Sequence, residues 1–270
     1  MKMLVNSEIY TYNEISNIPC KRCDIGDNFP VRKSHKYSPF LDCIKNKQLR
    51  GVCHTVFTPE LIGMRLSVDA TKIRNIDNAG GSSEESEALS FELLKRFYNA
   101  ILIKTEMQVK YKKMEMENGK KTDDNGKKTD YVCKIGDTII GVSVTRARSY
   151  FIDRAKKIAE KYPDRNILPG KPFSLEDAIK LLKKKLECIN ESNRYSLENW
   201  TKQLLHVWSA ENDISDKLEQ AFHNLERLEP ELVSNTVLLI TTTTGTACDF
   251  IYMNDRKSMQ NEQCYVGDNR

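Results

Sequence analysis

Two short β-strand patterns joined by Gly136-Asp137 constrain the fold of this chain more than any other feature. Residues 131–145 alternate with a period of two on either side of this dipeptide, which suits a tight hairpin turn although Asp-Gly is the favoured order. Counting outward from a two-residue turn places Asp130 directly opposite Ser143, on the same face of the hairpin. The other face is apolar and is predicted to be core; it holds Tyr131, Cys133, Ile135, Ile140, Val142 and Val144.

A helix predicted over residues 83–98 carries an acidic residue in an unexpected place. A flexible joint leads into this helix and ends in a capping box made by Ser82 and Glu85. On a helical wheel Glu87 falls inside the apolar arc. An ionised carboxylate there needs a cation, a hydrogen-bond partner or a raised pKa. The alternative is a first-turn glutamate that the helix dipole stabilises.

The rest of the chain predicts an α/β fold, with a mixed central sheet flanked by helices in the order αβββαβ. Residues 1–66 form a Cys-containing, loop-rich N-terminal region that packs on the core as an appendage. Residues 67–245 form the core, with a helical insertion over 150–191, and residues 246–270 form a polar C-terminal segment. Further helices are expected over 149–163, 175–189 and 196–210 and around Leu218, and the last strand over 236–244.

A near repeat separates the first two strands of this core. Residues 118–124 recur almost unchanged at 125–131, so Asp123 and Asp130 hold equivalent positions. Asp123 is predicted to lie in a long polar loop, whereas Asp130 enters the strand.

This order of elements, with one acid on the first helix and another on the second strand, resembles the PD-(D/E)XK nuclease-like superfamily over residues 82–244. The resemblance implies that Glu87 and Asp130 bind one or two divalent metal ions, Mg²⁺ or Mn²⁺, and orient the attacking water. The family carries an acid-x-lysine motif on the next strand, where this chain has Ser143 and Thr145. Ser143 would then supply an oxygen to the metal directly or through water.

The missing lysine has two candidate replacements. By the hairpin count Lys128 lies across from Thr145, and Lys134 lies further along the same face. Either ammonium would offset the negative charge that develops on a phosphate.

The segment QLLHVW also resembles the glutamine-bearing helix of recombination-type members of that superfamily. Gln203 holds the glutamine position, but the expected tyrosine is replaced by Val207. The alternative is an ordinary amphipathic helix with Leu204, Leu205 and Trp208 facing inward.

The cysteines allow a structural zinc site in the N-terminal region. Cys20 and Cys23 have the spacing of a zinc knuckle, and Cys43 with Cys53 or His54 would complete four Zn²⁺ ligands. Cys43 and Cys53 are further apart than in a usual second knuckle, so buried free thiols are the alternative.

Charge and hydropathy narrow the function classes without choosing among them. The net charge of +4 is too small to prove nucleic-acid binding, although lysines at 180, 183, 184 and 185, with 156 and 157, could follow a phosphate backbone. A solvated helix face is the alternative. No phosphate-binding loop or hydrolase triad is present in the sequence pattern.

The N-terminus lacks an export signal, and no apolar run reaches the roughly 20 residues that span a bilayer. The chain is therefore predicted to be intracellular, cytoplasmic or nuclear, with no membrane partner. The leading hypothesis is a metal-dependent nuclease, a hydrolase acting on phosphodiester bonds. Its rival is a catalytically inactive nuclease-like module that binds nucleic acid or a protein partner.

Overall fold

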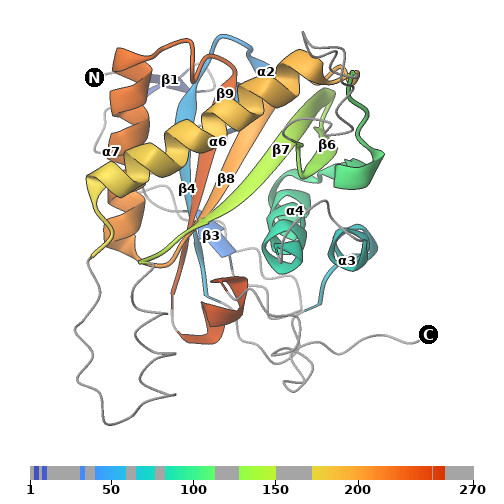
Figure 1. Ribbon diagram of the computed structural model, residues 1–270, viewed down its shortest axis with the longest axis horizontal. Helices are drawn as coiled ribbons and strands as arrows, with labels where there is room; N and C mark the ends of the chain where they lie inside the picture. The colour runs from blue at the N-terminus through green and yellow to red at the C-terminus, as the bar shows by residue number, and fades with distance from the viewer. Residues whose placement is uncertain are drawn as a thin grey trace, which may run out of the picture.

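A computed structural model describes residues 3–5, 8–10, 31–33, 40–58, 65–76, 83–112, 128–149, 172–244 and 246–252. These residues build an α/β fold around a seven-stranded mixed sheet with the order β3-β4-β9-β8-β7-β6-β5 (Figure 1). The strands of the sheet are β3 (Val31–Lys33), β4 (Gly51–Phe57), β5 (Ile101–Thr105), β6 (Tyr131–Ile135), β7 (Thr138–Ala147), β8 (Lys202–Ser209) and β9 (Thr236–Thr243). A separate ribbon pairs β1 (Met3–Val5) with β2 (Glu8–Tyr10).

Helices cover both faces of the sheet, as predicted for this fold class. One apolar cluster packs α2 (Phe40–Lys45), α3 (Val68–Asn75), α4 (Glu84–Tyr98) and the 3-10 helix η2 (Thr246–Tyr252) against one face. A second cluster packs α6 (Leu175–Tyr195) and α7 (Asn212–Leu228) against the other. We call these the α4 face and the α6 face. The short 3-10 helix η1 (Glu106–Gln108) follows β5 directly.

The predicted hairpin is confirmed in its register. Ile135 pairs with Thr138, and the antiparallel ladder continues to Tyr131 and Val142. Gly136 has a φ of 57°, in the left-handed region that glycine adopts without a side-chain penalty. The turn therefore fixes which residues of β6 and β7 lie opposite each other.

Replacing Gly136 with alanine is expected to lower the free energy of unfolding by about 1 kcal/mol, because a Cβ disfavours this backbone conformation. No atom lies within 4 Å of the added Cβ, so the cost comes from the backbone and not from a clash. Denaturant midpoints of Gly136→Ala and of Asp137→Ala, in the same turn, measure the effect. Equal midpoints for these two variants would contradict it.

The predicted helix over residues 196–210 is wrong, because most of this segment is strand β8. Every residue of β8 is buried, with β7 on one side, β9 on the other and helices on both faces. A strand enclosed in this way need not alternate between polar and apolar residues, and periodicity alone cannot distinguish it from a buried helix. Gln203, His206 and Trp208 therefore lie on a strand.

Part of the N-terminal region belongs to the central sheet. β4 pairs in parallel with β9 along its whole length, and β3 pairs with β4. The sheet thus joins residues from the predicted regions 1–66 and 67–245. Of the expected helix over residues 149–163 the structure describes residue 149 alone, and Asp123 lies outside the described residues. The elements α4, α6, α7 and β9 occur where they were predicted.

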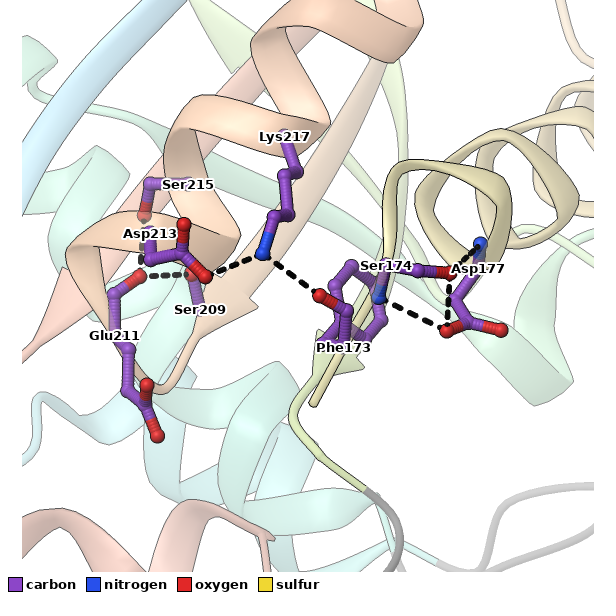
Figure 2. A network of polar contacts seen from close by, with 8 residues as sticks. All are labelled: Phe173, Ser174, Asp177, Ser209, Glu211, Asp213, Ser215 and Lys217. Atoms are coloured by element: carbon purple, nitrogen blue, oxygen red, sulfur yellow. Dashed lines mark hydrogen bonds and ion pairs between the residues drawn. The ribbon is translucent and has the colours of Figure 1, made fainter. Parts of the chain in front are cut away.

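The junction after β8 fixes the start of α7 (Figure 2). The hydroxyls of Ser209 and Ser215 both donate to the Glu211 carbonyl oxygen, at 2.9 and 3.2 Å. Lys217 Nζ donates to Asp213 Oδ2 at 2.5 Å and to the Phe173 carbonyl oxygen at 2.9 Å. These bonds hold the first turn of α7 beside the segment that leads into α6.

Candidate functional site

The candidate site lies where β7 extends past the end of β6. β6 begins at Tyr131 opposite Val142, whereas β7 continues to Ala147. Along residues 143–147 the described chain therefore provides no strand on this side of β7. We call this free edge of β7 the notch. It lies between α4 on one face of the sheet and α6 on the other.

Asp130 lies at the start of the notch, next to β7. Its carboxylate accepts a hydrogen bond from the Val144 backbone N–H at 2.5 Å, and its own N–H donates to the Val142 carbonyl oxygen at 3.0 Å. Burial raises the pKa of Asp130 to about 6, although the charge of Lys185 and the hydrogen bond from Val144 lower it.

Glu87 approaches the same edge from the first turn of α4. Only 4% of this residue is exposed, and its Oε1 accepts a hydrogen bond from the Ser83 hydroxyl at 2.5 Å. Burial, followed by the negative charge of Asp130, raises the pKa of Glu87 to about 8. The structure thus places the carboxyl groups of Glu87 and Asp130 close enough for the charge of Asp130 to raise the pKa of Glu87.

Two acids that sequence reasoning missed add to this negative charge. Glu106 raises the pKa of both Glu87 and Asp130, and Glu84 raises the pKa of Glu87. Glu106 directly follows β5, which ends beside the start of β6. Its place after the first core strand was a usable signal, but only the tertiary pairing of β5 with β6 brings it to the notch.

Ser143 and Thr145 turn toward the α6 face. Their lateral neighbours on β8 are Leu205 and Val207, which belong to the apolar cluster under α6 and α7. Ser143 is 7% exposed, and Thr145 is half-buried. No carboxylate or ammonium occupies either position of the acid-x-lysine motif.

Neither Lys128 nor Lys134 lies at the notch as the hairpin count predicted. Lys134 lies four residues from Asp130, about 13 Å along an extended strand, and its ammonium pairs with Asp137 in the turn at 3.4 Å. Lys128 precedes β6, and the ladder with β7 ends at Tyr131, so Lys128 is not paired with Thr145. Counting paired residues outward from the turn does not extend to Lys128, because β6 begins only at Tyr131.

Among the described residues, Lys185 is a cation whose charge lowers the pKa of Asp130. It lies on the same stripe of α6 as Ile189 and Ser192, which are four and seven residues further along the helix. The Ser192 hydroxyl lies 2.7 Å from the hydroxyl of Thr129, the neighbour of Asp130. Lys185 was predicted only as part of a basic face.

That basic face is divided among separate partners. Lys180 pairs with Glu176 and Lys183 pairs with Glu229, both at 2.7 Å. Lys184 is exposed, and the lysines at 156 and 157 lie outside the described residues. The described part of α6 therefore presents no continuous row of unpaired ammonium groups.

Gln203 contributes to packing between β8, β7 and α6. Its side chain is buried opposite Gly141, and its Nε2 lies 2.8 Å from Asn193 Oδ1 on α6. His206, on the α4 face, lies 2.7 Å from the hydroxyls of both Ser90 and Thr241. Burial lowers the pKa of His206 to about 3, so its imidazole is neutral.

The described residues hold no group of three or more His, Cys, Asp or Glu side chains arranged to bind a metal ion. Cys43 and Cys53 are buried in the apolar cluster on the α4 face, and Cys20 and Cys23 lie outside the described residues. The donor set at the notch is nevertheless suited to Mg²⁺, which commonly uses one or two carboxylates and keeps several waters.

Comparison with known proteins finds similarity to the AAC-rich mRNA clone AAC4 protein of Dictyostelium discoideum. The two sequences are 30% identical over 227 residues, which is 83% of this chain and 29% of that protein. The chain thus matches less than a third of this relative. No family model matches, and no solved structure matches. Among the described residues, no helix is long and apolar enough to cross a membrane.

Proposed function

We propose that the chain is a PD-(D/E)XK-like, metal-dependent nucleic-acid phosphodiesterase whose active site is the notch. The observation that carries this proposal is the meeting of Glu87 and Asp130 at the free edge of β7. They come from different elements, and each is buried enough to raise its pKa. Burying two carboxyl groups whose charges repel each other costs stability, which favours a functional reason for the arrangement.

Glu87 and Asp130 would hold Mg²⁺ or Mn²⁺, and water molecules would complete its coordination. When bound, the ion supplies an activated water and stabilises negative charge on the phosphate oxygens. The Val144 N–H orients the Asp130 carboxylate through its hydrogen bond. Lys185, which takes the electrostatic role expected of the family lysine, offsets negative charge beside Asp130.

Cleavage assays with labelled single- and double-stranded DNA and RNA test this proposal. We expect cleavage with Mn²⁺ and none with chelator, and a loss of at least about 100-fold in Asp130→Ala, because removing a metal ligand weakens ion binding and water activation. Asp137→Ala is the matched control, since Asp137 is a fully exposed acid in the turn of the same hairpin.

Ser143 and Thr145 favour a second candidate function, a nuclease-like module that binds nucleic acid without cutting it. Losing a ligand carboxylate and the motif lysine would leave binding without catalysis. Nucleic-acid binding that survives in Asp130→Ala, with no cleavage by the wild type in any metal, would select this candidate and exclude the enzyme.

A further inference from the structure

Asp130 lies just outside the paired part of β6. The ladder between β6 and β7 begins at Tyr131, opposite Val142. One backbone bond reaches further, from the Asp130 N–H to the Val142 carbonyl oxygen at 3.0 Å. The direction of the Asp130 carboxylate therefore depends also on what holds the preceding residue, Thr129.

Three hydroxyl groups meet at Thr129. Its backbone N–H donates to the Tyr111 hydroxyl oxygen at 2.8 Å, and its own hydroxyl lies 2.7 Å from the Ser192 hydroxyl. The Tyr111 and Ser192 hydroxyls lie 3.0 Å apart, so the three groups form a closed triangle, which we call the hydroxyl cluster. Thr129 is completely buried, and Ser192 is 1% exposed. A buried polar cluster whose members are all hydrogen-bonded specifies one geometry.

The hydroxyl cluster is anchored at the end of α6. Ser192 lies in the last turn of this helix. Tyr111 forms an antiparallel bridge with Ser196, directly after the helix. The neighbouring Lys112 N–H donates to the Tyr195 carbonyl oxygen at 2.8 Å. The segment after η1 and the segment before β6 are thus both tied to one helix.

We propose that the hydroxyl cluster positions the Asp130 carboxylate for metal binding at the notch. Bonds to both the N–H and the hydroxyl of Thr129 fix the backbone immediately before Asp130, whose carboxylate then reaches the Val144 N–H. The same helix carries Lys185, two turns before Ser192, so the cluster also sets Asp130 against this cation. The members of the cluster act through Asp130 and are positioning residues. This inference rests on the proposed function, because the metal ion at Asp130 belongs to that function.

Thr129→Val tests the proposal, because it removes one hydroxyl and nearly preserves the shape of the side chain. Mn²⁺ affinity, measured by calorimetry, is expected to fall about 10-fold, as when a partner that orients a metal ligand is lost. Thr129→Ser keeps the hydroxyl and should restore most of the affinity. Thr242→Val is the matched control, since the Thr242 hydroxyl on β9 also lies 2.7 Å from a buried helix serine, Ser215 of α7. This control should bind Mn²⁺ as the wild type does.

Amide hydrogen exchange, followed by NMR, gives a second measurement that needs no metal. The Val144 N–H, which Asp130 accepts, is expected to exchange about 10-fold faster in Thr129→Val and in Tyr111→Phe, but not in Thr242→Val. Tyr111 is half-buried, and its replacement by phenylalanine removes only the acceptor of the Thr129 N–H. It therefore serves as the second variant if Thr129→Val does not fold.

Thermal unfolding of the same proteins separates the possible outcomes. Folded variants with wild-type Mn²⁺ affinity and wild-type exchange at Val144 would overturn the positioning role. Equal losses in Thr129→Val and Thr242→Val would overturn it too, because they would show a general loss of stability. A wild type that binds no Mn²⁺ would instead overturn the metal-dependent function, while faster Val144 exchange confined to Thr129→Val and Tyr111→Phe would still support the role of the cluster in holding Asp130.

Discussion

Replacing Lys202 with methionine is expected to lower the free energy of unfolding by about 3 kcal/mol, which corresponds to a melting temperature lower by roughly 6–12 °C. Lys202 is the first residue of β8 and is completely buried. Its ammonium donates to the carbonyl oxygens of Asn46 at 3.2 Å, Lys47 at 3.1 Å and Leu49 at 2.5 Å. Methionine fills much of the same volume but removes the ammonium donor. The Asn46 carbonyl keeps the backbone N–H of Leu49 at 3.2 Å, whereas the Lys47 and Leu49 carbonyls lose their donor, and an unsatisfied buried polar group costs about 1–3 kcal/mol.

The position of these carbonyls explains the large expected effect of Lys202 on the free energy of unfolding. They follow the end of α2, where helix carbonyl groups lack partners and where the helix dipole favours a cation. Lys202 therefore ties α2 and the loop before β4 to the centre of the sheet. Urea denaturation of Lys202→Met, compared with Lys184→Met on the exposed side of α6, measures the effect. Equal midpoints in the two variants would show that the loop carbonyls find other donors.

The sequence predicted those features that depend on local geometry. The hairpin register follows from turn chemistry and a period of two, and the structure confirms it from Ile135 to Tyr131. The helix over residues 83–98 was predicted to within a residue at its start. The position of Glu87 within an apolar arc was readable from the helical period alone, without knowledge of the sheet.

Other features could not be predicted because they depend on which segments meet. β8 has no alternating pattern, since both of its faces are buried. Lys202, at its start, carries no local sign that three carbonyls will surround it. Glu106 and Lys185 act on Asp130 only after β5 pairs with β6 and α6 packs across the sheet. Ser143 and Thr145 stand where the resemblance expects an acid and a lysine, and the charged groups that act on Asp130 come from other elements.

Replacing Glu87 with glutamine is expected to stabilise the metal-free protein at pH 8, by on the order of 2–4 kcal/mol. The pKa of Glu87 is raised from 4.5 to about 8 by folding. The folded protein therefore binds a proton that the unfolded chain releases in this interval. The stability that this proton confers is complete below about pH 4.5 and is lost as the pH rises through about 8. Glutamine is neutral throughout and avoids the loss.

The variant and wild type should accordingly be close in stability near pH 4.5 and diverge as the pH rises. Glutamine can still accept the hydrogen bond from Ser83, so the comparison isolates the charge. Glu187→Gln, at an exposed position of α6, is the matched control and should show no such divergence. Chemical denaturation at several pH values, without added metal, gives the difference. A constant difference between Glu87→Gln and wild type would contradict a buried, charge-coupled Glu87.

Divalent metal should offset much of this difference at pH 8. An ion that binds the folded protein alone, present at about 100 times its dissociation constant, adds about 2.7 kcal/mol of stability. At pH 8 Mn²⁺ is expected to raise the melting temperature of the wild type and of Glu187→Gln, but not of Glu87→Gln, which lacks one of the proposed ligands. An equal rise in all three proteins would place the ion elsewhere. In the proposed site the proton and the metal would compete for the Glu87 carboxylate, and the ionised form, which costs stability at pH 8, is the form that would bind the ion.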